Sequence, residues 1–223
     1  MQKFRSFLQS SKTIPHTSWT AKSRWSLTPK TFVFLIGGLS IFGIGDALLI
    51  QSTIGNSPWS VFAQGLSVQT PLSIGQSTAI ISLGVLALWI PLREKPGFGT
   101  LANIVVISIF VQLGVDHIPA ATSNFLVQLL YVFLGIAFVG FGSAIYITCG
   151  LGPGPRDGLM TSLHKRTGIR ISRVRLSIEV TVLIIGSALG GTVGLGTALF
   201  ALLIGNSIAK NLNLVTKFSN RLA

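Results

Sequence analysis

The chain has 223 residues, of which 49% are hydrophobic and only 10% are charged. Soluble domains contain about 25% charged residues, so this composition excludes an ordinary soluble protein and indicates an integral membrane protein. The net charge of +12 suggests a nucleic-acid partner at first sight. The positions of the basic residues favour membrane topology as its cause, and no nucleic-acid partner is expected.

Enzyme, metal and cofactor signals are missing. One cysteine, Cys149, and three scattered histidines form neither a disulfide nor a metal-ligand pattern. There is no nucleophile elbow and no phosphate-binding loop. The glycine-rich stretch 150–158 lacks the preceding strand that a dinucleotide loop needs. The sequence therefore predicts no enzyme, no cofactor and no metal site.

Residues 1–30 form a basic tail with six Lys or Arg residues and no acid. No small-x-small cleavage site follows the first apolar run, so a signal peptide is not expected. Two interpretations remain for this tail. It is a disordered cytoplasmic segment, or it is an interfacial anchor on anionic lipid with Trp19 and Trp25 at headgroup depth.

The apolar segments predict an all-α polytopic membrane helix bundle with six spans, because several runs approach or exceed the roughly 18–20 residues that cross a bilayer. The expected spans are 31–52, 73–92, 97–115, 125–148, 174–191 and a sixth that follows the glycine turn 190–197 and ends near 209.

Two breaks interrupt this pattern, at 53–72 and 150–168. In the first, Ser57 suits a helix N-cap and Pro58 the first helical position, with a short helix over 59–66. In the second, Pro155 precedes a short helix over 159–167 that Gly168 ends.

The basic residues give the orientation. The N-terminal tail holds six of them, the turn after the second span two, the stretch after the fourth span six, and the C-terminal tail three, which accounts for all 17. Six spans place every one of these segments on one side, as the positive-inside rule requires. The sequence thus predicts an inner-membrane protein with both termini in the cytoplasm and anionic lipid against its cytoplasmic face.

An internal repeat appears when the chain is shifted by 97 residues. The shared residues are mostly glycines and helix-cap residues: Gly38, Gly43, Gly45, Ala47, Gly55, Pro58, Gly97, Gly99 and Thr100 fall on Gly135, Gly140, Gly142, Ala144, Gly152, Pro155, Gly194, Gly196 and Thr197. Each unit holds three spans, an odd number, so the second unit is inverted relative to the first. The expected units are tail 1–30, first repeat 31–118, second repeat 125–210 and tail 211–223.

The repeat gives the two breaks a functional interpretation. Broken segments at corresponding positions often build the central site of inverted-repeat transporters. If both breaks dip inward, the helix N-termini after Pro58 and Pro155 point partial positive charge at a common cavity. The alternative, two surface loops with short interfacial helices, stays open.

The candidate site residues are the charged and aromatic residues near these breaks. Glu179 lies inside the fifth span with Arg175 four residues earlier, so the two form a local pair at the surface or line a cavity. Arg156 and Asp157 follow Pro155 in the first turn of the short helix, where Asp157 suits the positive helix end. Arg156 neutralises Asp157 or pairs with Glu179 as a structural clamp, or it binds an anionic group.

Trp59 takes the matching position in the first break, as an interfacial residue or a pocket wall. Asp46 in the first span caps nearby backbone or binds a cation. Small-xxx-small faces at Gly43/Ala47, Gly140/Ala144 and Gly186/Gly190 serve packing within the chain or a homodimer.

The motifs resemble a known family. They are Gly152-Pro153-Gly154-Pro155-Arg156-Asp157-Gly158-Leu159-Met160, Arg175-x-x-x-Glu179, and Leu189-Gly190-Gly191-x-x-Gly194-x-Gly196-Thr197. Together with Ser57-Pro58-Trp59 they resemble the YczE/YyaS/YitT-like family of bacterial membrane proteins over about residues 43–205. The resemblance implies a bacterial inner-membrane protein with five or six spans. Asp46 and Asn206 depart from the pattern.

Two functional hypotheses follow. The first is a secondary permease or channel-like carrier for a small solute, with the two breaks forming its site. The second is a non-transporting membrane regulator or scaffold. A buried cavity lined by Trp59, Arg156 and Glu179 favours transport, whereas a packed interior with these side chains on its rim favours the scaffold.

Overall fold

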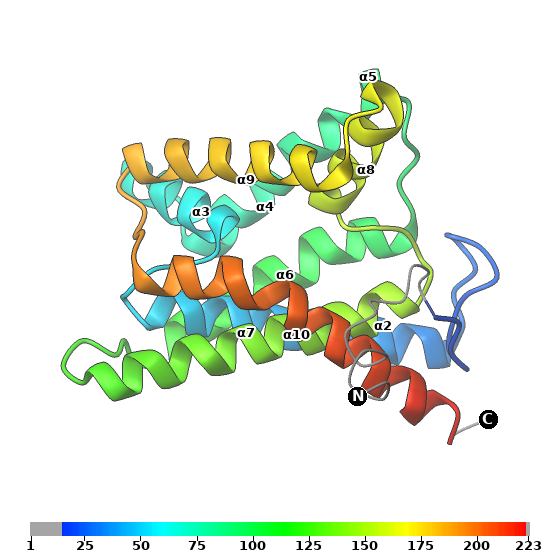
Figure 1. The fold of residues 1–223 in the computed structure, drawn as a ribbon, viewed down its shortest axis with the longest axis horizontal. Coiled ribbons are helices and arrows are strands. Elements are labelled where there is room, and N and C mark those ends of the chain that lie inside the picture. The colour runs from blue at the N-terminus through cyan, green and yellow to red at the C-terminus, as the bar shows by residue number, and fades with distance from the viewer. Residues whose placement is uncertain (1–14, 222–223) are drawn as a thin grey trace, which may run out of the picture.

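The computed structural model describes residues 15–221, and every regular element within that range is a helix (Figure 1). The helices in chain order are α2 (Pro29–Gln51), α3 (Pro58–Gln69), α4 (Ile74–Ala87), α5 (Trp89–Leu92), α6 (Phe98–His117), α7 (Phe125–Thr148), α8 (Pro155–Thr167), α9 (Ile171–Ala188) and α10 (Leu195–Ser219).

Five helical segments within the described range are long and apolar enough to cross a membrane. They are α2, the segment Ile74–Leu92 formed by α4 and α5, and the helices α6, α7 and α10. These agree with five of the six predicted spans. The remaining one, predicted over 174–191, corresponds to α9, which is not among the five and carries Arg173, Arg175 and Glu179 within its 18 residues.

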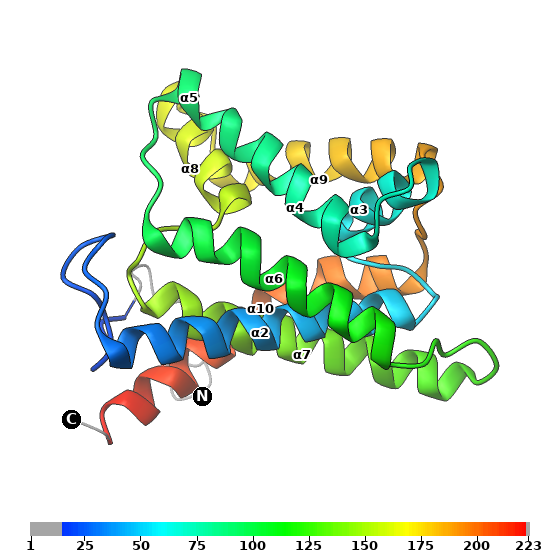
Figure 2. The same cartoon turned by 180° about the vertical axis from the view of Figure 1, so that it is seen from behind.

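The helices form two layers. One holds α2, α6, α7 and α10, and the other holds α3, α4, α8 and α9, with the short α5 at the edge (Figures 1 and 2). In the first layer α2 packs along α7, with α6 against α2 and α10 against α7. The described part of the chain contains three hydrophobic clusters, and one of them joins Trp59 of α3 to Leu159 and Met160 of α8.

Glycines let α2 and α7 approach closely in antiparallel orientation. A Cβ on Gly38 would lie 3.1 Å from the carbonyl oxygen of Gly142, and one on Gly45 would lie 2.9 Å from that of Gly135. A contact at this distance leaves no room for a larger side chain. The small-residue faces predicted from the sequence are likewise used within the chain: Gly43 meets Phe110 of α6 and Gly186 meets Phe62 of α3.

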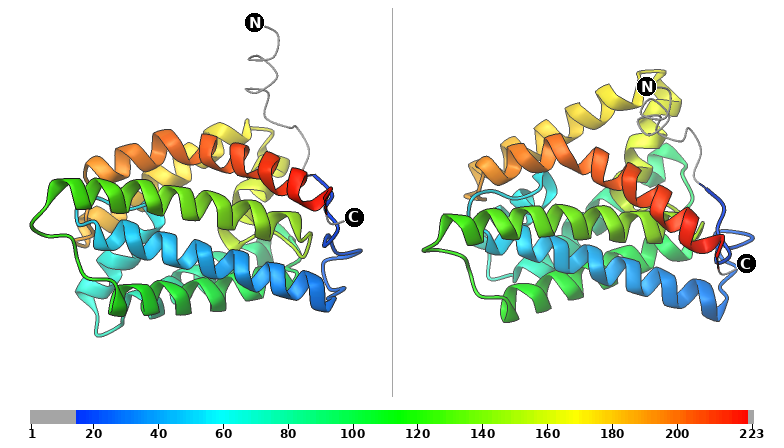
Figure 3. Two further views of the ribbon diagram at one scale, coloured as in Figure 1. Left: turned by 90° about the horizontal axis from the view of Figure 1, so that it is seen from below. Right: turned by 60° about the horizontal axis from the view of Figure 1, so that its bottom comes forward.

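The two ends of the molecule differ. The described chain ends, the α5–α6 turn and the α7–α8 connection lie at one end, and the α3–α4, α6–α7 and α9–α10 connections lie at the other (Figures 1 and 3). We call the first the basic end, because the segments that meet there carry Lys30, Lys95 and Lys217. The other is the far end. Helix α3 runs back toward the far end and α8 toward the basic end, so the two breaks enter from opposite sides.

Helix boundaries and hydrogen bonds recur at the spacing of 97. Helices α3 and α8 begin at Pro58 and Pro155, α4 and α9 at Ile74 and Ile171, and α6 and α10 at Phe98 and Leu195. The Gly99 N–H donates to the Leu151 carbonyl at 2.8 Å, and the Gly196 N–H donates to the Ile54 carbonyl at 2.8 Å. Gly99 corresponds to Gly196 and Ile54 to Leu151 at this spacing, so each half donates the same hydrogen bond to the other.

The N-terminal segment packs against the bundle from residue 15 on. Trp19 is buried, stacks on Phe34 with ring centroids 4.0 Å apart, and donates from Nε1 to Thr148 Oγ1 at 3.2 Å. The two predictions for Trp19, a disordered segment and an anchor at headgroup depth, are therefore wrong, because its ring is part of a hydrophobic core cluster at the basic end. Trp25 is exposed. Residues 1–14 lie outside the described range.

Helix α10 continues past residue 210, where the sequence placed the start of the C-terminal tail. Val215 is buried in the same cluster as Trp19, and Ser219 Oγ accepts a hydrogen bond from the Ser18 N–H at 2.7 Å. The tail 211–223 is therefore helical as far as Ser219, because the N-terminal segment supplies an apolar surface for its last turns.

Candidate functional site: a cavity between the two breaks

The first break turns into the protein interior. Residues Gly55 to Val61 are all buried. Ser57 caps α3, with its Oγ accepting from the Ser60 N–H at 3.3 Å, and Pro58 takes the first helical position. Both predictions are confirmed. Gly55 has φ +122°, a left-handed conformation that favours glycine, and this lets the chain turn against α10.

The second break repeats this geometry. Gly152 has φ +107°, and Pro155 takes the first position of α8. Gly168 ends α8 with φ +69°, which confirms the predicted C-cap. The Pro155 carbonyl accepts from Trp89 Nε1 at 3.0 Å, so a fully buried tryptophan fixes the start of α8.

Arg156 and Trp59 bring the two breaks into contact. The Arg156 guanidinium carbon lies 5.0 Å from the centroid of the Trp59 ring. Such a cation–π contact contributes about 0.5–2 kcal/mol and uses none of the five N–H donors of the guanidinium. The two residues are 97 apart and occupy the same helical position in α8 and α3.

The carboxylates at the site are each held by a neighbour. Asp46 of α2 is buried, and its Oδ1 accepts from the Ser57 hydroxyl at 3.4 Å. The Tyr146 hydroxyl of α7 donates to Asp157 Oδ2 at 2.6 Å. Arg175 Nε donates to Glu179 Oε1 at 2.8 Å, which confirms the local pair predicted from their spacing. The sequence predicted a cap-like bond from Asp46 to nearby backbone or a cation site; the bond seen is instead to the side chain of Ser57, which itself caps α3.

A cavity of about 620 Å³ lies where these residues meet. Its lining draws on α2, α3, α4, α6, α7, α8, α9 and α10. Of the predicted site residues, Asp46, Pro58, Trp59, Arg156, Asp157, Arg175 and Glu179 line it. Pro155 is not among the lining residues; its carbonyl accepts from Trp89 Nε1 at the start of α8. The volume suits a metabolite-sized ligand.

Several lining residues were missed by the sequence analysis. Ser82, Asn103, Ser143 and Tyr146 all line the cavity. The spacing of 97 would have found two of them, because Ser143 corresponds to Asp46 and Ser82 to Glu179. Tyr146 has no such signal: a lone tyrosine at the end of an apolar span is indistinguishable from an interfacial residue.

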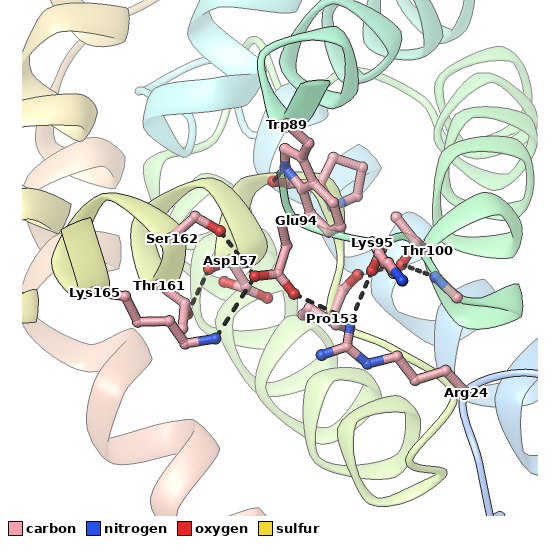
Figure 4. Close-up of polar contacts among 12 residues, drawn as sticks. Arg24, Trp89, Glu94, Lys95, Thr100, Pro153, Asp157, Thr161, Ser162 and Lys165 are labelled. Atoms are coloured by element: carbon pink, nitrogen blue, oxygen red, sulfur yellow. Dashed lines mark hydrogen bonds and ion pairs between the residues drawn. The ribbon is translucent and has the colours of Figure 1, made fainter. Parts of the chain in front are cut away.

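A polar cluster lies beside the cavity at the basic end, where its member Arg24 forms part of the cavity wall (Figure 4). Glu94 accepts from Arg24 at 3.1 Å and from Ser162 at 3.2 Å, and Lys165 lies 3.6 Å away. Burial raises the pKa of Glu94, but the hydrogen bond from Arg24 and the charge of Lys165 outweigh it, so the pKa lies below its usual value. The cluster ties the N-terminal segment and α8 to the α5–α6 turn.

Thr100 joins the same wall from α6. Its Oγ1 accepts from the Gly97 N–H at 3.1 Å and donates to the Pro153 carbonyl at 2.8 Å. The cap of α6 thus also holds the second break in place. Thr197, the matching residue of α10, accepts from the Gly194 N–H at 3.3 Å.

The helices and the cavity together define a class: a helical membrane protein with two inward-turning breaks around one cavity. The chain belongs to the family described as "Family of unknown function (DUF6198)", which matches residues 29–211. No solved structure matches it.

Three relatives support this membership. An uncharacterized protein of Haemophilus influenzae is 43% identical over 92% of this chain and 94% of its own. The uncharacterized membrane protein YczE of Bacillus subtilis is 34% identical over 78% of this chain and 81% of its own. The uncharacterized protein YyaS of the same organism is 31% identical over 73% and 82%. The resemblance to the YczE/YyaS family is confirmed, and the chain is a membrane protein.

Proposed function

We propose that this protein is a secondary permease or channel-like carrier that moves a small solute through the cavity. One observation carries the proposal: 14 of the 26 described residues that line the cavity fall into pairs 97 apart. The pairs are Phe42 and Val139, Asp46 and Ser143, Ser57 and Gly154, Trp59 and Arg156, Ser82 and Glu179, Asn103 and Phe200, and Ile107 and Ile204. A lining paired in this way supports a site on the axis of an inverted repeat.

This pairing supports an architecture of six spans in two inverted repeats, with α9 as the remaining span. Its charged residues Arg175 and Glu179 line the cavity. Its other face carries exposed Leu176, Val180 and Ile184, spaced four residues apart as on a lipid-facing stripe. A helix that lines a polar cavity tolerates charge at membrane depth, because its charged side chains need not enter lipid.

The positions of the breaks support a site that alternates between two sides. In inverted-repeat carriers the binding site lies at the repeat interface, and rocking of one half against the other exposes it in turn. Here the breaks enter from opposite ends and meet at Trp59 and Arg156. The charge distribution supports a cytoplasmic position for the basic end, against the anionic lipid of a bacterial inner membrane.

A regulator or scaffold without a transport path has less support. Trp59, Arg156 and Glu179 line one cavity rather than the rim of a packed interior. A scaffold has no need for a cavity of this volume on its internal axis.

Two-sided accessibility tests the proposal. Cys149 is replaced by alanine, and Ser143, which lines the cavity from α7, is replaced by cysteine. A membrane-impermeant thiol reagent is then applied to inside-out and to right-side-out vesicles. We expect Ser143→Cys to react from both faces, because a carrier exposes its central site to each side in turn.

Val68→Cys is the matched control. Val68 is 61% exposed near the end of α3, and we expect it to react from one face only, which excludes leaky vesicles. If Ser143→Cys also reacts from one face only, no path crosses the protein and the permease proposal fails.

A further inference from the structure

The chemistry of the cavity indicates what kind of solute it takes. Of the residues from 15 to 221, six charged ones line it, three of each sign: Arg24, Arg156, Arg175, Asp46, Asp157 and Glu179. Equal numbers of positive and negative residues give the cavity no preference for the charge of a solute. The preference depends on which of these groups already have partners.

Five of the six are engaged. Arg24 donates to Glu94 at 3.1 Å and to the Lys95 carbonyl at 2.6 Å. Arg175 and Glu179 bind each other. The two aspartates accept hydroxyl hydrogen bonds, as described above.

Arg156 is the exception. Among residues 15–221 it forms no ion pair and no side-chain hydrogen bond, and its recorded contact is with the face of Trp59. The guanidinium always carries its charge, and its planar donors match the two oxygens of a carboxylate or a phosphate. The side chain is only partly buried, and the charges of Asp46, Asp157 and Glu179 act on it without accepting its N–H donors, so these donors remain available to a ligand in the cavity.

The surroundings of Arg156 favour the same ligand. The first residues of α3 and α8 face the cavity, so the partial positive charge of two helix N-termini adds to that of the guanidinium. Phe42, Ile107, Val139 and Phe200 supply an apolar wall. We propose that the cavity binds a small organic anion whose oxyanion group (a carboxylate, phosphate or sulfonate) pairs with Arg156 while its apolar body packs on this wall.

This inference rests on the proposed function for its biological meaning, but its test does not require transport. Thr161 of α8 lines the cavity one turn beyond Asp157. In the Cys149→Ala background, Thr161→Cys offers a thiol to two methanethiosulfonate reagents, the anionic sulfonatoethyl and the cationic trimethylammonium-ethyl compound. The rates are measured on purified protein and divided by those of free 2-mercaptoethanol.

We expect the anionic reagent to react at least about tenfold faster than the cationic one after this correction, the factor that about 1.4 kcal/mol of differential interaction produces. Arg156→Gln, which keeps a polar side chain with an NH2 donor group but removes the positive charge, should abolish the preference. Arg156→Lys should retain most of it. Arg93→Gln removes one positive charge outside the cavity and should leave it unchanged.

A preference for the cationic reagent, or an anionic preference that survives Arg156→Gln, overturns the inference. The outcome is independent of the two-sided labelling of Ser143→Cys. If the anionic reagent is preferred at Thr161→Cys but Ser143→Cys reacts from one face only, the protein binds anions in the membrane without transporting them. Two-sided labelling without anion preference leaves a carrier for another class of solute.

Discussion

Gly158 is the position where one methyl group should disturb the site most. It lies in the second turn of α8, and a Cβ there would overlap the indole ring of Trp89. That ring is 1% exposed and is hydrogen-bonded to the Pro155 carbonyl at the start of α8. Gly158→Ala therefore forces α8 away from Trp89, and Arg156 moves with it.

The magnitude follows from three opposing contributions. Alanine in a helix interior gains about 1 kcal/mol over glycine. Overpacking costs about 1–3 kcal/mol, and weakening the Trp89 hydrogen bond costs about 1 kcal/mol more. The net loss is about 1–3 kcal/mol, or a fall in Tm of roughly 2–12 °C at about 2–4 °C per kcal/mol.

Cys149 provides the assay. It is fully buried, and burial raises the pKa of its thiol to about 12, so it reacts slowly in the folded protein. A thiol-reactive fluorescent dye therefore reports unfolding of purified protein as the temperature rises. Gly84→Ala is the matched control: Gly84 lies in α4 with open space around it, and alanine there should raise Tm slightly.

If Gly158→Ala proves as stable as Gly84→Ala, the packing of α8 on Trp89 is not as described, and the placement of Arg156 loses its support. A second check uses Trp89→Leu, which removes the ring. In that background the methyl group at Gly158 should no longer destabilise the protein.

Two further predictions concern the polar cluster and Thr100 at the basic end. The pKa of Glu94 is lowered in the folded protein, so its contribution to stability is complete above the unfolded pKa near 4.5 and is lost as the pH falls through the lower, folded pKa. The Tm difference between wild type and Glu94→Gln should therefore vanish in acid, and a difference that stays constant with pH would contradict this. Thr100→Val removes a bond to the Pro153 carbonyl as well as the α6 cap and should cost about 1–3 kcal/mol, whereas Thr197→Val removes only the α10 cap and should cost about half as much. Equal losses in thermal unfolding would show that Thr100 does not hold the second break.

Local sequence signals predicted most of the fold. Length and apolarity located five spans, since each such run must be helical to satisfy its own backbone in lipid. Ser57 and Pro58 predicted the start of α3 and Gly168 the end of α8, because caps depend on the residue itself and its nearest neighbours. The pair of Arg175 and Glu179 follows from a separation of four residues on one helix.

The sequence by itself determined the helices, the two breaks and the spacing of 97 that links them. Only the tertiary structure decided that both breaks turn inward, that Arg156 lies over Trp59, and that Tyr146 holds Asp157. It also decided that Trp19 belongs to the core. The physical reason is range: helix propensity, capping and hydropathy act over a few residues. The cavity instead depends on contacts between residues far apart in the chain, such as Trp59 and Arg156, which are 97 positions apart, and no local pattern encodes which of them meet.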